Sequence, residues 1–377
     1  MKKILVLTDD MPWGHRSIAK AIFNFLKEKE TEVGYQVDYT EVRSEPHFAY
    51  RLYKFAYRYL PKSWGLNENI NKLKWVRYFY SKIFDLGLSN LRLSINRFNP
   101  DLIISTYFGH SHALANWRKA EDLDFKLWTV VADPWTSSPI GFVKDCDLSL
   151  VYDEKAEDLV VKYGIDPKKV LKTGWWVRPE MYSKFDQKEV RKKYEIPNGG
   201  PVIFVGGGSF GNNSIFKILP MLDSINEKAV FVFNTGTDRL AYDLIEQKKK
   251  NLKNKGNKIV IKNFGWIENM AEILSACDMV LGKAGPNFLF DCVACGKPFV
   301  AITHISGQED GNLELIKKKK LGWVKETTEE IADFLHKYIK NPALYENKCR
   351  KEIKEEALRN EKSLEVVLDK IKKDLVL

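Results

Sequence analysis

The sequence predicts an α/β protein made of two doubly wound domains. Short apolar runs of strand length alternate with amphipathic stretches of helix length along the chain, which is the pattern of parallel sheets covered by helices. The alternation is interrupted by the turn-rich segment Pro197–Pro201 and then starts again. With 377 residues, the chain is long enough for two domains of ordinary size.

The first half opens with a βαβ unit, and its amphipathic helix is expected at Arg16–Lys29. The later strands are almost wholly apolar, as parallel strands buried on both faces are. A second helix is expected at Glu154–Tyr163. The strands expected in this half are Lys3–Thr8, Gln36–Val42, Leu102–Thr106, Leu127–Ala132, Leu148–Tyr152 and Val170–Thr173.

The second half repeats the pattern, and its first strand runs into the glycine-rich turn 206–211. We place the first domain at residues 1–175 and the second at residues 176–345. The charged remainder, residues 346–377, is expected to form one or two helices. The strands expected in the second half are Val202–Val205, Val230–Asn234, Ile259–Ile261, Met279–Leu281 and Phe299–Ile302.

Composition narrows the class of protein. A hydrophobic content of 44% is typical of globular proteins, and no apolar run reaches the ~20 residues needed to span a bilayer. The apolar N-terminus is cut short by Asp9 and Asp10, so we interpret it as a first strand and not as a signal peptide. Five cysteines, an odd number, favour a reducing compartment. The net charge of +10 favours an anionic partner: a membrane surface, a nucleic acid or a phosphorylated substrate.

The segment Gly282–Asn312 carries the clearest chemistry. A Gly-Lys-Ala-Gly-Pro turn opens a helix that contains Asp291, and a polar loop with Gln308 and Glu309 follows the next strand. Free N–H groups and the positive dipole end at a helix N-terminus suit a diphosphate. A carboxylate farther along the helix can accept both ribose hydroxyls, and the polar loop can bind sugar hydroxyls. This order of groups indicates a nucleotide-sugar site.

The same segment resembles the donor half of a glycosyltransferase family. That family contains the monogalactosyldiacylglycerol synthases, the bacterial processive diacylglycerol glucosyltransferases and the peptidoglycan transferase that adds N-acetylglucosamine to lipid I. Its sugar-binding loop, Gly-Gln-Glu-x-x-Asn, is matched by Gly307–Asn312, and its ribose-binding glutamate is replaced by Asp291. Weaker matches lie at Gly14–Ser17, Thr129–Asp133 and Thr173–Pro179.

The resemblance implies the GT-B architecture, with residues 176–345 binding the donor, residues 1–175 binding the acceptor and the C-terminal helices crossing back to the first domain. It also implies an inverting enzyme that uses a UDP-hexose as donor substrate, with no cofactor and no required metal. The expected donor contacts are Gly207, Gly208, Ser209, Phe264, Gly285, Pro286, Asn287, Asp291, Gln308, Glu309 and Asn312.

Two residues are candidates for the catalytic base, which must take a proton from the acceptor hydroxyl. His15 precedes the first helix in Gly14-His15-Arg16-Ser17, which matches the family's Gly-His, although the family's preceding glycines are replaced here. Asp133 ends the strand Leu127–Ala132, where the family has a comparable acidic residue. The sequence leaves the choice between them open. His110 and His112 lack a third ligand nearby, so no metal site is expected.

The segment 47–98 departs from the α/β rhythm. From Tyr50 to Phe98 it contains ten lysines and arginines against Glu68 and Asp85, with aromatic residues interleaved. Cationic and aromatic side chains together suit a lipid headgroup surface. RNA binding and ordinary packed helices with solvated basic edges are the alternatives. Because the family's lipid-acceptor insertion falls here, we favour an anionic membrane surface and expect no nucleic acid partner.

We therefore expect a hexosyltransferase that acts on a lipid acceptor, with diacylglycerol favoured, from the cytoplasmic face of a membrane. One alternative is an enzyme like UDP-N-acetylglucosamine 2-epimerase, which shares the architecture and needs no acceptor. Another is a subunit that binds a nucleotide-sugar or a membrane without catalysis. The replaced glycines before His15 and the altered residues after Asp133 keep the second alternative open.

Overall fold

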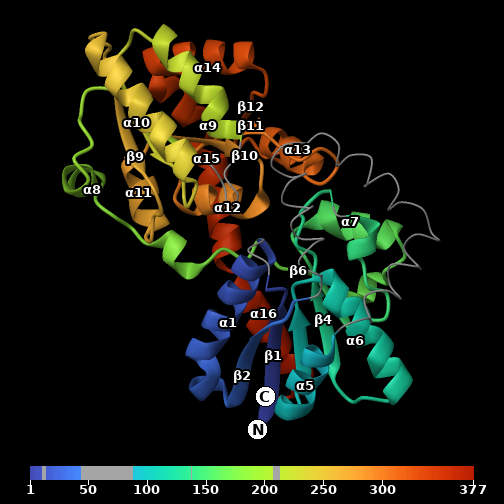
Figure 1. Cartoon of the computed structure of the whole chain (residues 1–377). Helices are drawn as coiled ribbons and strands as arrows, with labels where there is room; N and C mark the ends of the chain where they lie inside the picture. The colour runs from blue at the N-terminus through green and yellow to red at the C-terminus, as the bar shows by residue number, and fades with distance from the viewer. Residues whose placement is uncertain (11–13, 44–87, 137, 207–212) are drawn as a thin grey trace.

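Two parallel six-stranded sheets, each packed between helices, form the protein (Figure 1). The structure is a computed structural model that describes residues 1–10, 14–43, 88–136, 138–206 and 213–377. One sheet is formed by the first half of the chain and the other by the second half. The predicted α/β class is therefore confirmed.

The first sheet has the strand order β2-β1-β3-β4-β5-β6. Its strands are β1 (Lys2–Thr8), β2 (Tyr35–Glu41), β3 (Leu102–Ser105), β4 (Lys126–Val130), β5 (Leu148–Val151) and β6 (Val170–Lys172). The α-helices described in this half are α1 (Gly14–Val33), α5 (Ser89–Phe98), α6 (Phe108–Glu121) and α7 (Glu154–Lys162). The chain winds outward from β1 in both directions, so the order reverses between β1 and β3.

The second sheet has the order β12-β11-β10-β7-β8-β9, which reverses between β7 and β10. Its strands are β7 (Val202–Gly206), β8 (Ala229–Asn234), β9 (Ile259–Phe264), β10 (Met279–Lys283), β11 (Phe299–Thr303) and β12 (Gly322–Val324). The helices that accompany it are α8 (Gln187–Lys193), α9 (Asn213–Ile218), α10 (Arg239–Asn254), α11 (Met270–Ala276), α12 (Pro286–Ala294), α13 (Asp310–Lys318) and α14 (Thr328–Lys340).

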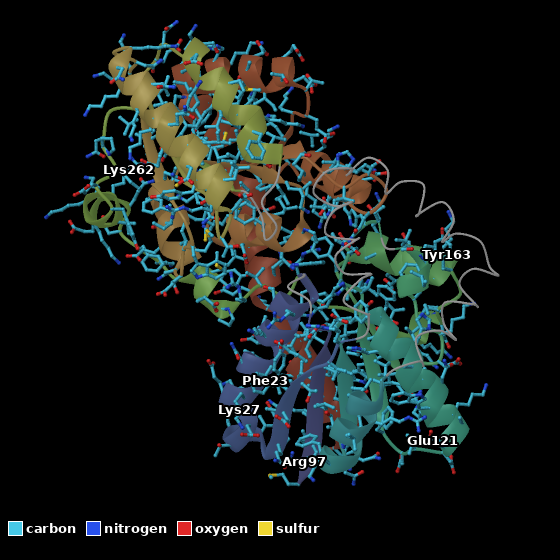
Figure 2. The ribbon with its side chains drawn as sticks, in the orientation of Figure 1. Phe23, Lys27, Arg97, Glu121, Tyr163 and Lys262 are labelled. Atoms are coloured by element: carbon cyan, nitrogen blue, oxygen red, sulfur yellow. The ribbon has the colours of Figure 1, made fainter. Side chains whose placement is uncertain are left out.

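Both faces of each sheet are buried, which explains why the strands are apolar at nearly every position. In β1, Ile4 and Val6 face one apolar cluster while Leu5 and Leu7 face another. The first of these clusters continues without a break into the second domain. Trp175 and Phe290 stack across the boundary with ring centroids 5.0 Å apart. Charged side chains such as Lys27 and Glu121 lie at the periphery instead (Figure 2).

The C-terminal tail forms two helices, α15 (Pro342–Glu361) and α16 (Ser363–Leu375). Helix α15 packs against α12 in the second domain, and α16 packs against α1 in the first. The two chain ends consequently lie near each other beside β1 (Figure 1). The Lys126 ammonium donates to the carbonyl of Asp374 at 2.6 Å, which ties the last helix to the first sheet.

The segment 47–98, predicted to bind a membrane surface, is described only from residue 88 onward. Within that part, α5 buries Leu91 and Ile95 against the first domain and exposes Leu93. Arg92 pairs with Glu121 at 2.6 Å and lies 4.4 Å from the ring centre of Trp117. Helix α5 is therefore docked on the fold. The remainder of the segment lies outside the described residues.

Candidate active site

The strand order reverses between β1 and β3 in the first sheet and between β7 and β10 in the second. These two points face each other across the domain boundary. In doubly wound sheets, ligands bind beyond the carboxyl ends of the strands at such points. A Cβ on Gly14, which opens α1 after β1, would meet the side-chain amide of Asn287. Asn287 stands in the first turn of α12, which follows β10. The backbone beyond β1 thus lies next to the predicted donor helix.

His15 lies beyond β1 in the first turn of α1, at the first domain's reversal point. Its Nδ1 is 2.7 Å from the carbonyl oxygen of Thr106, the residue after β3. A carbonyl oxygen only accepts, so Nδ1 carries the proton and the neutral ring keeps its lone pair on Nε2. Burial lowers the pKa of His15 to about 4, and the bond to Thr106 raises it in part. The side chain is thus held in the tautomer and charge state of a base.

Tyr107 connects His15 to a second histidine. Its ring meets His15 edge-on at 5.5 Å and His110 edge-on at 5.2 Å between ring centres. His110 is completely buried in α6, and burial lowers its pKa to about 3. His112, also in α6, bonds through Nε2 to the carbonyl of Ile140 at 2.8 Å. These two histidines pack inside the first domain.

Asp133 stands three residues beyond β4 and is partly exposed. Strand β3 lies between β1 and β4, so the strands that lead to His15 and Asp133 are about 10 Å apart, or two strand spacings. The residues after Asp133 are held from both domains. Trp135 Nε1 donates to the carboxylate of Asp153 at 3.0 Å, and the amide of Gly311 in α13 donates to Thr136 Oγ1. Asp133 therefore lies on the first domain's side of the same boundary.

The N-terminus of α12 is formed by predicted donor contacts. Gly285 is the N-cap, Pro286 is the first helical residue, and the chain has no side-chain cap there. Asn287 accepts a hydrogen bond from Trp175 Nε1 at 3.1 Å. Since Trp175 lies in the crossover between the domains, Asn287 also fixes how α12 meets α1.

Asp291, the predicted ribose ligand, lies on the same helix with only 13% of its side chain exposed. Its Oδ2 is 3.3 Å from Arg178 Nη2, a contact across the crossover segment. Burial raises the pKa of Asp291 to about 6, and the charge of Arg178 counteracts this in part. Its carboxyl is thus desolvated, and above about pH 6 it is ionised, which is the form that can accept from both hydroxyls of a ribose.

Arg178 also lines a pocket of about 310 Å³ between the crossover segment and α11. The other residues that line it are Glu180, Met181, Ser183, Phe185, Glu268, Asn269, Met270 and Ala271. Phe264, the predicted base contact, ends β9 a few residues upstream, and its carbonyl accepts from the amide of Thr235 at 3.0 Å. Trp266, between Phe264 and the pocket, is 74% exposed.

The predicted sugar loop joins β11 to α13. Gln308 is partly exposed, whereas Glu309 and Asn312 are buried. Glu309 pairs through Oε1 with Lys283 and through Oε2 with the amide of Ile305, at 2.7 Å. Asn312 Nδ2 donates to the carbonyl of Ala284 at 2.8 Å. The loop is therefore bonded to the turn that precedes α12, so the two predicted donor segments form one unit.

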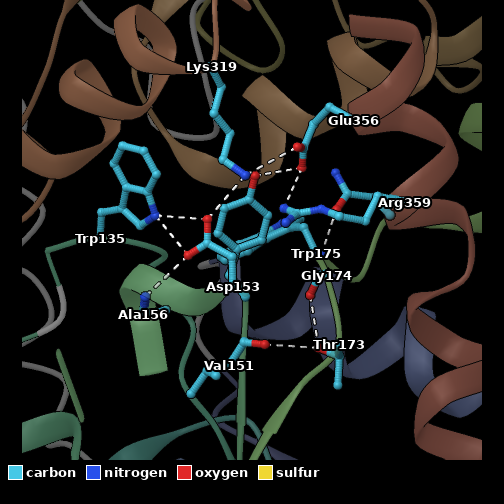
Figure 3. Close-up of polar contacts among 12 residues, drawn as sticks. Trp135, Val151, Asp153, Ala156, Thr173, Gly174, Trp175, Lys319, Glu356 and Arg359 are labelled. Carbon is cyan, nitrogen blue, oxygen red and sulfur yellow. Dashed lines mark hydrogen bonds and ion pairs between the residues drawn. The ribbon is translucent and has the colours of Figure 1, made fainter. Parts of the chain in front are cut away.

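A polar cluster joins the domains beside this unit (Figure 3). Glu356 on α15 accepts from Tyr152 at 2.5 Å and from Arg359 at 2.7 Å. Lys319, just after α13, lies 3.1 Å from Asp153 and 3.3 Å from Glu356. Asp153 in turn accepts from Trp135, so the cluster connects the residues after Asp133 to the C-terminal helices.

Three predicted donor contacts, Gly207, Gly208 and Ser209, lie outside the described residues. Among the residues that the structure does describe, no group of three or more His, Cys, Asp or Glu side chains is placed to hold a metal ion. No helix in the described ranges is both long enough and apolar enough to cross a membrane. The independence from metal remains a prediction.

The structure adds Lys283, Arg178, Trp175 and Thr136 to the candidate site. Lys283 stands inside the Gly-Lys-Ala-Gly-Pro turn, so its position in the sequence was a usable signal. Arg178 and Trp175 fall in the weakly matched segment Thr173–Pro179. Thr136 carries no sequence signal, because its bond to Gly311 depends on how the two domains meet.

Comparison with known proteins agrees with this geometry. A family model described as the glycosyltransferase family 28 C-terminal domain matches residues 202–368, and one described as monogalactosyldiacylglycerol synthase matches residues 15–177. The chloroplastic monogalactosyldiacylglycerol synthase of Spinacia oleracea is 25% identical over 349 residues, which is 88% of this chain and 65% of that protein. The chain thus spans just under two thirds of that plant relative.

A bacterial relative is covered more fully. The processive diacylglycerol beta-glucosyltransferase of Bacillus cereus is 22% identical over 328 residues, which is 84% of this chain and 80% of that protein. Among solved structures, MurG of Acinetobacter baumannii has a TM-score of 0.62 at 12% identity, with 99% of this chain and 100% of that one covered. HepE of Anabaena, in complex with UDP and glucose, has a TM-score of 0.59 at 12% identity, with both chains fully covered.

The fold and the two matched models define a glycosyltransferase of the GT-B class. Within that class, the chain is similar to the monogalactosyldiacylglycerol synthases and the processive diacylglycerol glucosyltransferases. The predicted fold and the predicted family are both confirmed.

Proposed function

We propose that this protein transfers a hexose from a UDP-sugar to the hydroxyl of a diacylglycerol-type lipid, with inversion at the anomeric carbon. The contact between Gly14 and Asn287 carries the proposal, because it puts His15, held as a neutral base, beside the donor helix. The names of the relatives support the reaction class and the acceptor class.

In this mechanism His15 Nε2 takes the proton of the lipid hydroxyl as its oxygen attacks the anomeric carbon. A new carbon–oxygen bond forms on the face opposite the leaving group. The bond from the anomeric carbon to the β-phosphate oxygen breaks, and its electron pair stays on that oxygen. The negative charge of bound UDP raises the basicity of the nearby imidazole, which offsets its low pKa in the empty protein.

The donor residues have distinct tasks. Asp291 accepts the ribose hydroxyls, and the pocket beside Arg178 takes the base. Gln308 and Asn312 lie on the loop that would meet the hexose. Asp133, at the acceptor edge, orients the lipid hydroxyl. The reaction as proposed uses no metal and no cofactor.

We further propose that the protein works at the inner, cytoplasmic face of a membrane, held there through an anionic lipid surface. The basic and aromatic composition of residues 47–98 supports this. Each basic residue near an anionic leaflet contributes about 1 kcal/mol. Binding to vesicles with and without phosphatidylglycerol, measured at low and high salt, tests it. Equal binding to both vesicle types would contradict the electrostatic attachment.

The function itself is tested by product analysis. The protein is incubated with UDP-glucose or UDP-galactose and with vesicles that contain diacylglycerol. The lipids are then separated, and their masses are measured by mass spectrometry. A lipid heavier by one hexose, formed in step with UDP, is the expected result. Conversion of UDP-N-acetylglucosamine to its 2-epimer without acceptor would favour the epimerase alternative. UDP binding without transfer or donor hydrolysis would favour the non-catalytic alternative.

A further inference from the structure

Lys283 and Glu309 form a buried ion pair at the second domain's reversal point. Lys283 is the last residue of β10, and Glu309 precedes α13. Only 14% of the lysine side chain and 4% of the glutamate side chain are exposed. An ion pair this deeply desolvated contributes little net stability, so its place at a ligand-binding edge needs another explanation.

The glutamate is anchored independently of the lysine. Its second carboxylate oxygen accepts from the amide of Ile305 at 2.7 Å. The loop that carries it is bonded to the turn before α12 through Asn312 and Ala284, at 2.8 Å. The position of the Glu309 carboxylate is therefore fixed by these bonds, and the carboxylate holds the ammonium of Lys283 in place.

The lysine adds positive charge where a helix N-terminus already supplies some. A Cβ on Gly285, the N-cap of α12, would lie 3.2 Å from Lys283 Nζ. The amide groups of the first helical turn carry about half a positive charge. The ammonium and the helix N-terminus together make this edge favourable for an anion.

A second observation points to a ligand at the same edge. Asn312 is fully buried, and its Oδ1 accepts no hydrogen bond from the residues that the structure describes. An unmade hydrogen bond of a buried amide is costly. Since Asn312 Nδ2 bonds the turn between Lys283 and Gly285, a ligand hydroxyl at this edge would supply the missing donor.

We propose that Lys283 binds the donor diphosphate and that Glu309 is a positioning residue that holds Lys283, and does not itself contact the hexose. The inference rests on the proposed function, because it assigns a role within the UDP-sugar site. When the bond from the anomeric carbon to the β-phosphate oxygen breaks, the ammonium stabilises the charge left on that oxygen. It does so without giving up its proton, which stays on Nζ throughout.

The assignment revises what the sequence predicts for Glu309, namely a contact to the sugar. Each oxygen of the Glu309 carboxylate already accepts one strong hydrogen bond, from an ammonium and from an amide, so we assign it to holding these two groups. Gln308 is the partly exposed neighbour on the same loop. Sugar recognition is consequently left to Gln308 and Asn312.

Calorimetric titration of UDP and uridine separates the two roles. Lys283→Met should lower UDP affinity roughly 10- to 100-fold and leave uridine affinity unchanged. The double variant Lys283→Met/Glu309→Gln removes both charges together, so it avoids a lone buried carboxylate and should show the same loss. Lys297→Met is the matched control, since that part-buried lysine donates to the carbonyls of Cys277 and Ser275, at 2.7 and 3.1 Å.

Glu309→Gln completes the test with UDP and UDP-hexose compared. A positioning role predicts that the affinities for both ligands change by the same factor. A loss confined to UDP-hexose would show that Glu309 reads the sugar and would overturn its assignment. If wild-type protein binds UDP and the lysine variants keep the wild-type ratio of UDP to uridine affinity, the lysine assignment is wrong while the proposed function stands. Absence of UDP binding by the wild type would instead reject the proposed function.

Discussion

The chemistry of this protein depends first on single side chains whose charge states are set by burial. His15 and Asp291 are ordinary titratable residues that the fold moves in opposite directions. Burial lowers the pKa of His15 to about 4 and raises the pKa of Asp291 to about 6. In each case the neutral form is favoured. For His15 that form is the base, whereas for Asp291 the ionised form needed to bind ribose is obtained only above about pH 6.

Replacement of His15 tests its role as base. His15→Ala should lower transfer by a factor of roughly 10² to 10⁴, the usual contribution of a positioned base. UDP affinity should stay unchanged, because the ring is neutral, lies in the first domain and bonds to Thr106. Initial rates of hexosyl-lipid formation, with calorimetry on the same preparations, measure both quantities. If the variant transferred hexose at the wild-type rate, His15 would not be the base and Asp133 would be the remaining candidate.

Replacement of Asp291 by asparagine should raise stability as it weakens UDP binding. The pKa of Asp291 is higher in the folded protein than its ordinary value, so its ionisation lowers the stability of the fold. This loss of stability is absent below about pH 4 and complete above about pH 6. The cost of ionising buried Asp291 is then up to about 3 kcal/mol. Asp291→Asn should therefore unfold at a higher urea concentration than wild type, with a larger gain at pH 8 than at pH 5. A gain independent of pH would refute this account of the carboxyl.

At the scale of elements, the site is made by helix N-termini and strand ends that meet across the boundary. Gly14 and Gly311 mark two close approaches, at α1 against α12 and at α13 against the residues after Asp133. A Cβ on Gly311 would lie 2.6 Å from the carbonyl carbon of Trp135 and 2.8 Å from the amide nitrogen of Thr136. These are backbone atoms, so only displacement of a segment could make room.

The variant Gly311→Ala tests whether this approach matters for transfer. It should lower the transfer rate at least tenfold by moving α13 away from Thr136, since small misplacements of reacting groups are costly. Uridine affinity should remain, because the base pocket lies by α11. Gly141→Ala is the control, as a Cβ there meets no atom within 4 Å. Equal transfer rates in both variants would show that the approach is incidental.

Elements and local motifs were predictable from the sequence, because they depend on short-range pattern. The predicted Lys3–Thr8 strand is β1 (Lys2–Thr8), and the predicted Phe299–Ile302 strand is β11 (Phe299–Thr303). Contacts between segments that are distant in the sequence were not predictable. The pairing of Glu309 with Lys283, the bond of Asp291 to Arg178 and the bond of Thr136 to Gly311 all depend on tertiary geometry.

At the scale of the whole molecule, the two domains behave as one packed body. An apolar cluster runs through the boundary, and the Tyr152–Glu356 cluster adds a polar connection beside it (Figure 3). Lys319 and Arg359 lie over the Tyr152 ring at 4.6 and 4.5 Å from its centre. Helix α16 then packs against α1, so the C-terminal part of the chain also connects the second domain to the first.

Removal of one charge from that cluster should be costly. Lys319→Met leaves the buried carboxylates of Asp153 and Glu356 with one partner fewer each, and should lower the free energy of unfolding by about 1–3 kcal/mol. The neighbour Lys320, 68% exposed and 3.6 Å from Glu352, provides the control. Lys320→Met should change stability by less than about 0.5 kcal/mol. Urea unfolding of both variants measures this difference. Equal unfolding midpoints would mean that the cluster does not stabilise the contact between the domains.

The donor site is the central claim, and calorimetric titration of UDP into wild type and Asp291→Ala tests it most directly. We expect saturable 1:1 binding to the wild type, and an affinity roughly 10- to 100-fold weaker in the variant because the charged ribose contacts are lost. Affinity for free phosphate should be the same in both. Binding of UDP with equal affinity to both proteins would remove Asp291 from the site. A wild-type protein that binds no UDP would contradict the account as a whole.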